Sequence, residues 1–323
     1  MPNNINPFSN KVVQRTTKLM GNRFEFTVAG MEEETGEKII DEAIAEVKRI
    51  ENLFTTFHPG SQTNLVNRNA GIRPVIVDQE MFDLIQRSIR ISHLTDGAFD
   101  LTYGSVDKSL WNFDVSMTVL PDIETARQSV RLINYRNIIL DEKSCTVFLK
   151  EKGMRIGFGG IGKGYAAECA RRLMKSRGAE SGIVNAAGDL TTWGLRPDGR
   201  QWTIGIVDPD HTSRVFASVN GTDMSVATSG NYEKYAVIDG KKYSHTIDPH
   251  TGLPITGIKS VTILCPNAEL ADALATPVMI MGIKTGLNMV NQMRNIGCIM
   301  IDEQNRVYTS TNINMHEEFL QPA

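Results

Sequence analysis

The chain has 323 residues, enough for one large domain or two, and its 41% hydrophobic and 22% charged residues are ordinary for a globular protein. A net charge of −3 gives no reason to expect a nucleic-acid partner, and the lack of a run of eighteen apolar residues argues against a membrane span. Residues 1–18 contain neither the apolar core of a signal peptide nor a cysteine for a lipid, so we expect the sequence as it stands to be cytoplasmic; a longer natural form with an export signal is compatible with it.

The first half of the chain predicts two amphipathic helices and a pair of strands. Residues 37–54 place their apolar side chains on one helical face. The polar, turn-rich residues 55–71 predict a loop with at most one short helical turn. Asp78 is positioned to cap the second helix at its N-terminus, and residues 137–150 predict two strands around a polar turn.

The second half mixes helix and strand signals. It predicts first a helix over 163–177, a buried strand over 182–188 and a hairpin over 235–245 that turns at Asp239–Gly240. A strand over 260–266 and a helix over 268–282, which Pro277 interrupts, come next. A further helix and a closing strand pair end the chain. Antiparallel hairpins of this kind are not needed in a doubly wound fold, so the pattern indicates an α+β (mixed α/β) protein.

Four cysteines, Cys145, Cys169, Cys265 and Cys298, lie far apart in the sequence and form no C-x-x-C pair. A zinc site or a redox dithiol is therefore not favoured. We expect these side chains to behave as small buried hydrophobic groups in the reduced state.

Residues 156–168, IGFGGIGKGYAAE, fit two phosphate-binding patterns incompletely. As a P-loop, the segment has Gly164 where a Ser or Thr must ligate Mg²⁺. As a dinucleotide fingerprint, it lacks the acidic residue at the end of the next strand, because Glu180 precedes that strand. A tight strand-to-helix turn that needs glycine only for packing is the alternative. Both motifs share a helix N-terminus that offers free N–H groups to an anion.

The segment ADALATP suggests where a metal ion binds. Asp272 and Thr276 are four residues apart on the predicted helix, so their side chains share a face. Pro277 has no N–H, and the carbonyl of Ala273 therefore loses its helical partner. One carboxylate, one hydroxyl and a freed carbonyl suit a hard cation such as Mg²⁺. The alternative is a solvated Asp and a Thr hydroxyl bonded back to its own helix.

A histidine follows the predicted hairpin, in YSHTIDPHTGLP. His245 lies just before an Asp-Pro turn, where it could act as a general base or simply be satisfied by the turn backbone. We expect His250, within the turn, to be exposed. The other histidines have no neighbours in the sequence that suggest chemistry.

Taken together, these segments resemble the ApbE family, flavin transferases that use FAD as a substrate. The resemblance extends from about residue 18 to residue 300 and follows the family's order: KLMGNRF, TTFHPGSQTNLVNRNAG, TDGAFDLTYGSV, LWNF, GGIGKGYA, VNAAGDL, VATSGNYEKY, YSHTIDPHTG and ADALAT. It implies a single ApbE-like domain over residues 1–323, with a core over about 18–310 and an extended segment over 1–17. It also implies antiparallel sheets flanked by helices, and an FAD site in a cleft between two lobes.

The activity that this resemblance implies is Mg²⁺-dependent transfer of FMN from FAD to a Thr or Ser hydroxyl of a partner protein, with release of AMP. An FAD pyrophosphatase that uses water as acceptor and a non-catalytic flavin-binding protein are the alternatives. SVATSG and ALAT superficially resemble the family's acceptor segments, but we interpret both as parts of the site.

The resemblance also assigns site residues. Catalytic roles fall on His245, which would take the proton from the acceptor hydroxyl, and on Asp272. The implied FAD contacts are Met20, Phe57, Ala98, Phe99, Asp100, Gly157, Lys163 and His245. The implied metal ligands are Asp272, Thr276 and a backbone carbonyl of Ala275, Gly160 or Gly162.

Physical roles fit these positions. Met20 and Phe57 could sandwich an adenine, Asp100 could accept a hydrogen bond from the adenine amino group or a ribose, and Lys163 could neutralise the pyrophosphate.

Three positions depart from the family pattern. Gly157 stands where many members have Asp, Phe57 where many have Tyr, and Pro277 where the helix usually continues with Ala. The contact that this carboxylate makes in other members is either lost or supplied elsewhere, and the balance between transfer and hydrolysis stays open. At Pro277 we expect reshaped metal coordination rather than its loss.

Overall fold

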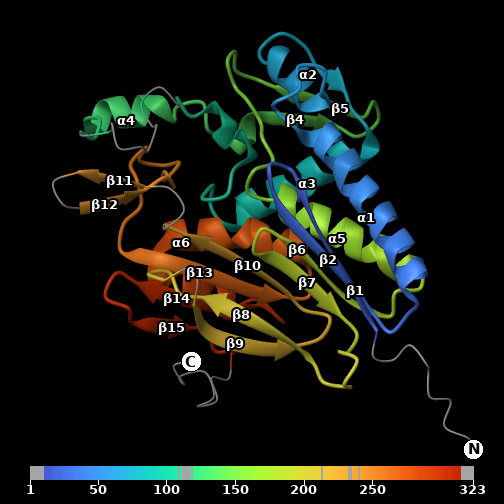
Figure 1. Cartoon of the computed structure of the whole chain (residues 1–323). Helices are drawn as coiled ribbons and strands as arrows, with labels where there is room; N and C mark the ends of the chain where they lie inside the picture. Colours follow the sequence, from blue (N-terminus) through green and yellow to red (C-terminus); the bar gives the residue numbers. More distant parts are fainter. Residues whose placement is uncertain are drawn as a thin grey trace, which may run out of the picture.

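An eight-stranded antiparallel sheet forms the centre of the molecule (Figure 1). The computed structural model describes residues 11–107, 110, 117, 119–211, 214–231, 235–238 and 241–313. The strands lie side by side in the order in which they occur in the chain: β1 (Val12–Leu19), β2 (Asn22–Ala29), β6 (Ser181–Ala186), β7 (Asp189–Trp193), β10 (Ser225–Gly230), β13 (Ile258–Cys265), β14 (Gly297–Asp302) and β15 (Val307–Thr309). Since β1 begins at Val12, the sheet includes residues that the sequence predicted to precede the core.

Helices α1 (Glu33–Phe54), α5 (Gly162–Ser176) and α6 (Ala268–Asn291) cover one face of this sheet, and α3 (Gln79–Leu94) packs against α6. The buried side chains of α1 recur every three or four residues, which is why the segment forms an amphipathic helix against the sheet and α5; they are Ile39, Ile40, Ala43, Val47, Ile50 and Phe54. On the opposite face, the hairpin of β8 (Trp202–Val207) and β9 (Val215–Gly221) packs Ile204 and Ile206 against Val226 of β10.

Two smaller units flank the main body. The first consists of α2 (Gln62–Arg68) and a three-stranded sheet of β3 (Val75–Ile76), β5 (Thr146–Leu149) and β4 (Ile138–Asp141). The second, which we call the small lobe, contains α4 (Ile123–Ser129), β11 (Tyr235–Ile238) and β12 (Lys241–Ser244), and it has its own apolar cluster around Ala126, Ile238 and Ile247. The short 3₁₀ helices η1 (Leu101–Ser105) and η2 (Tyr135–Asn137) link these parts.

Most predicted elements are confirmed, including the mixed α+β class. The segment expected as a loop over 55–71 contains α2, which Ser61 caps by accepting a hydrogen bond from Asn64 N at 3.1 Å. Asp78 stands at the N-cap of α3, but its carboxylate accepts from the Gln62 amide rather than from the helix. The β11–β12 hairpin is confirmed, and its expected Asp239–Gly240 turn lies outside the described residues.

The prediction that Pro277 interrupts α6 is wrong. The helix passes through Pro277, because proline keeps a helical φ and removes a single N–H donor. The break comes at Gly282, whose φ of 80° and ψ of 171° are not helical. The further helix expected in the sequence is the remainder of α6 beyond this kink.

One helix of the described part of the chain, α6, is long and apolar enough by composition to cross a membrane. Half of its apolar window is buried inside the fold, where α6 packs against α5, β10 and β13, and buried core helices meet the same criteria.

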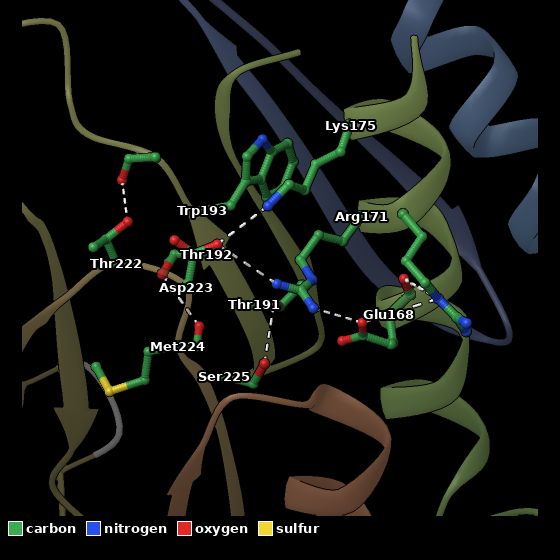
Figure 2. A network of polar contacts seen from close by, with 12 residues as sticks. Glu168, Arg171, Lys175, Thr191, Thr192, Trp193, Thr222, Asp223, Met224 and Ser225 are labelled. Carbon is green, nitrogen blue, oxygen red and sulfur yellow. Dashed lines mark hydrogen bonds and ion pairs between the residues drawn. The ribbon is translucent and has the colours of Figure 1, made fainter. Parts of the chain in front are cut away.

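A polar network fixes the second half of α5 to its neighbours (Figure 2). Glu168, 3% exposed, accepts hydrogen bonds from Arg171 Nη2 at 2.6 Å and from Ala268 N, at the start of α6, at 3.2 Å. Lys175 Nζ lies 3.2 Å from Asp223 Oδ1, just before β10. Because α5 is tied to both α6 and the sheet, its N-terminal residues are held in a defined place above the strands.

Candidate active site

A cavity of about 720 Å³ opens where the main body meets the small lobe. This volume lies within the range of ordinary small-molecule sites, about 300–1,000 Å³. Its walls come from the β1–β2 turn, the end of α1, the 98–104 segment, the glycine loop, the segment after β12 and the middle of α6. The predicted site residues that line it are Met20, Phe57, Ala98, Phe99, Asp100, Gly157, Gly160, Lys163, His245 and Thr276. Gly162, Asp272 and Ala275 are not among the lining residues, although Asp272 Oδ1 lies 3.6 Å from Lys163 Nζ, which is one of them.

Met20 occupies a strained turn at one side of the cavity. Met20 (φ 50°) and Gly21 (φ 75°) form the two-residue connection between β1 and β2, and both have positive φ. Glu51 of α1, which also lines the cavity, accepts a hydrogen bond from Met20 N at 3.0 Å and so holds the turn. Phe57, the expected partner of Met20 in an adenine sandwich, is 96% exposed at the cavity mouth.

Asp100 has a larger structural role than the sequence suggested. Its Oδ1 accepts from Thr102 N at 2.7 Å and Thr102 Oγ1 at 2.6 Å, and its Oδ2 accepts from Tyr135 N at 2.7 Å. Asp100 is 9% exposed, and burial raises the pKa of its carboxyl group by more than these hydrogen bonds lower it. A carboxylate offers about four acceptor positions, so about one remains for a ligand.

The glycine loop leads into α5, whose N-terminus is capped from another helix. Asp272 of α6 accepts a hydrogen bond from Gly164 N through Oδ2 at 2.8 Å, and a carboxylate at this end of a helix is favourable. A Cβ on Gly164 would lie 2.2 Å from Ala268 O and 2.6 Å from Asp272 Cβ. Glycine at position 164 is therefore required by the close α5–α6 crossing, which accounts for the lack of a P-loop hydroxyl.

Lys163 lies between two carboxylates. Its Nζ forms an ion pair with Asp189 Oδ2 and is 3.6 Å from Asp272 Oδ1. Asp189 and Asp272 are 4% and 7% exposed. Burial raises the pKa of Asp189, the Lys163 ammonium lowers it and the nearby Asp272 carboxylate raises it again, so the net shift is upward. The cluster of Asp189, Asp272 and Lys163 thus contains two buried carboxyl groups and only one ammonium group, so it has less positive than potential negative charge.

The oxygen atoms around Asp272 and Thr276 fit a hard cation. Asp272 uses Oδ2 for the helix cap and directs Oδ1 toward the Lys163 ammonium. Thr276 Oγ1 contacts Ser229 Oγ of β10 at 2.8 Å, and the described residues contain no bond from this hydroxyl back to its own helix. A carboxylate, a hydroxyl and nearby backbone carbonyls are the ligands that Mg²⁺ prefers.

His245 directly follows β12 and is held by its flanking turn. Ser244 Oγ accepts from Thr246 N at 3.1 Å, and Tyr103 of η1, through its hydroxyl oxygen, accepts from Ile247 N at 3.0 Å. His250, half-exposed, then bridges the turn to the 95–100 segment, with Nε2 2.8 Å from Asp96 O and Nδ1 3.0 Å from Asp248 Oδ1. This turn therefore positions His245 at the wall formed by residues 98–100.

Sequence reasoning missed four residues that shape the site: Glu51, Tyr103, Asp189 and Ser229. Asp189 had a signal, since it follows Gly188 directly in the VNAAGDL motif. Ser229 lies in VATSG, but its partner Thr276 is 47 residues away. The contacts of Glu51 and Tyr103 depend on tertiary packing that no local pattern encodes.

Comparisons with known proteins agree with this architecture. The model of the ApbE family matches residues 20–300. An FAD:protein FMN transferase of Klebsiella pneumoniae is 32% identical over 84% of this chain and 86% of its own length, and one of Escherichia coli K12 is 29% identical over 82% and 77%. The crystal structure of the ApbE protein of Thermotoga maritima superposes with a TM-score of 0.84 at 30% identity, covering 93% of this chain and 97% of that one. The flavin transferase ApbE of Vibrio cholerae superposes with a TM-score of 0.79 at 26% identity, covering 93% and 97%. With more than half of its length matched by the family model, the chain belongs to the ApbE family.

Proposed function

We propose that this protein is a Mg²⁺-dependent FAD:protein FMN transferase, which moves FMN from FAD to a Thr or Ser hydroxyl of a partner protein and releases AMP. The main support is the cavity that brings Met20, Lys163, His245 and Thr276 together from distant parts of the chain. The choice of FAD as the substrate rests on the full-length relatives, which bear the name FAD:protein FMN transferase.

In this proposal, each side chain has a separate task. The apolar wall around Met20 and Phe99 binds a flat ring system and excludes water from it. Lys163 offsets the negative charge of the pyrophosphate, which otherwise repels an incoming oxygen nucleophile. Asp189 keeps the Lys163 ammonium in place by their ion pair.

The transfer step balances as a phosphoryl substitution. The hydroxyl oxygen of the acceptor forms a bond to the phosphorus on the FMN side, and the bond from that phosphorus to the bridging oxygen breaks. AMP leaves with the bridging oxygen, and His245 takes the hydroxyl proton, because imidazole is the ordinary proton acceptor near neutral pH.

Asp272 and Thr276 would hold the Mg²⁺ ion, with carbonyl oxygen from Ala275, Gly160 or Gly162. When bound, the ion supplies charge neutralisation at the pyrophosphate and at the leaving AMP. The buried excess of carboxylate over ammonium described above supports a cation at this place.

Turnover of FAD in the purified protein tests the proposal. FAD and MgCl₂ are incubated with the protein and with a Thr-containing acceptor peptide, with and without chelator, and the products are separated by chromatography. We expect AMP and flavin-labelled peptide, both lost with chelator. The Asp272→Ala variant should lose turnover while it retains some flavin binding. Wild-type turnover in this variant would refute the assignment of Asp272.

The same experiment without the peptide measures hydrolysis. AMP and free FMN in equal amounts would make water the acceptor and the protein a pyrophosphatase. FAD that stays intact until the peptide is added is the result expected of a transferase. FAD that is bound but never cleaved, with or without peptide, would mean a flavin-binding protein.

A further inference from the structure

The hydroxyl of Ser229 is the one side-chain group that forms a hydrogen bond with the hydroxyl of Thr276 in the described part of the chain, at 2.8 Å. Ser229 lies on β10, a central strand between β7 and β13, and Thr276 lies on α6, which packs across that strand. Both side chains are partly buried. The contact therefore joins the rigid sheet to the turn of α6 that faces the cavity.

Counting protons gives this contact a direction. Each hydroxyl has one proton and two lone pairs. If Thr276 Oγ1 faces a cation, it does so through a lone pair, so its proton must be donated elsewhere. Some helical hydroxyls in this protein donate back along their own helix, as Ser92 does to Ser88 O at 3.0 Å and Ser176 to Leu173 O at 2.7 Å. Thr276 has Ser229 instead, which can accept the proton and leave the lone pairs of Thr276 turned away from the sheet.

We infer that Ser229 is a positioning residue for the divalent cation: it accepts the Thr276 hydroxyl proton and fixes the rotamer in which Thr276 Oγ1 serves as a ligand. The inference rests on the proposed function, because it needs the cation site at Asp272 and Thr276. Groups that orient a metal ligand in this way typically change metal affinity by about 10–100-fold when they are removed.

The same pair of strands offers a matched control. Thr228 and Thr262, on β10 and β13, form a second hydroxyl–hydroxyl contact at 2.9 Å, one residue along the strand from Ser229. Thr262→Val removes that contact with nearly the same side-chain shape. A general loss of stability from a missing hydroxyl on these strands would therefore appear in both Ser229→Ala and Thr262→Val.

Titration of the protein with Mn²⁺, monitored by electron paramagnetic resonance, measures cation binding directly and so tests the inference independently of enzymatic activity. We expect the Kd for Mn²⁺ to rise about 10–100-fold in Ser229→Ala and to stay at the wild-type value in Thr262→Val. Activity of Ser229→Ala should return toward the wild-type rate when Mg²⁺ is raised to saturation, since the ligand itself remains. Thermal unfolding of both variants shows that each one is folded.

Other outcomes would overturn the inference in distinguishable ways. An unchanged Kd in Ser229→Ala, with binding lost in Asp272→Asn, would refute the role of Ser229 and leave the proposed function standing. Complete loss of binding in Ser229→Ala would make Ser229 itself a ligand. Binding that is unchanged in Asp272→Asn as well would refute the cation site, and the inference would fail with it.

Discussion

Met20 has a backbone conformation that a glycine adopts more easily. A methionine at φ 50° costs about 1–2 kcal/mol relative to an unstrained position. The hydrogen bond from Met20 N to the Glu51 carboxylate nevertheless holds the turn in place. In this conformation Met20 forms part of the cavity wall. Strain of this kind at a cavity is typical of a side chain that contacts a ligand.

Met20→Gly should therefore separate stability from binding. Relief of the positive φ offsets lost packing and the greater freedom of glycine in the unfolded chain, so we expect the free energy of unfolding to change by less than about 1 kcal/mol. The Kd for FAD should rise several-fold, measured by fluorescence titration. Asn295→Gly, an exposed position with φ 59° that does not line the cavity, is the control and should leave the Kd unchanged. FAD binding as tight in Met20→Gly as in the wild type would exclude Met20 from the ligand contact.

At the scale of elements, the turn after β12 depends on the protonation of His250. Both ring nitrogens face groups that only accept hydrogen bonds, the Asp96 carbonyl and the Asp248 carboxylate, so only the imidazolium makes both bonds. Burial lowers the pKa of His250, but these two bonds and the nearby charges outweigh it, and the pKa is raised. The guanidinium of Arg136 lies 3.8 Å from the carboxylate of Asp96.

The sign of the pH effect follows from this raised pKa. The stabilisation is fully present below the ordinary histidine pKa, about 6.5. It is lost as the pH rises through the higher pKa of the folded state. We expect the free energy of unfolding of the wild type to fall over that window relative to His250→Gln, measured by denaturant titration at a series of pH values. Parallel curves for the two proteins would show that His250 does not titrate with folding.

Local patterns predicted most elements, because amphipathic helices and hairpins are recorded in neighbouring residues. Helix α1, the 138–149 strand pair and the β11–β12 hairpin are examples. The cap of α5 could not be predicted in this way, since Gly164 and Asp272 are 108 residues apart. The end of the predicted helix at residue 282 coincides with the kink at Gly282, whereas the additional break expected at Pro277 is wrong, because proline keeps a helical φ and removes a single N–H donor.

For the site, the resemblance to the ApbE family named side chains of which most line the cavity, but it did not indicate how the hydrogen-bonding atoms of those side chains are shared with their neighbours. The carboxylate of Asp100 uses most of its acceptor positions for hydrogen bonds from Thr102 and Tyr135. Asp272 divides its two oxygens between a helix cap and the Lys163 side. Such sharing depends on packing between elements distant in the sequence.

At the scale of the whole molecule, the cavity joins the main body to the small lobe, so a ligand that fills it contacts both. We expect FAD at about 100 times its Kd to stabilise the protein by about 2.7 kcal/mol. The measurement uses His245→Ala with Mg²⁺, so that FAD persists during denaturant unfolding. Hydrogen exchange should slow both in the β1–β2 turn and in residues 245–254. Slowing in only one of these segments would mean that the ligand does not bridge the two parts.

The order of strands in the large sheet has a consequence for how the chain is made. Each strand from β2 to β15 pairs with the strand that precedes it in the sheet, and that strand is always earlier in the chain. During synthesis from the N-terminus, every strand of this sheet after β1 therefore meets a partner already present when it leaves the ribosome. The nascent sheet grows at one edge only, and at each stage the unpaired N–H and C=O groups of that edge strand are the ones to which the next strand pairs.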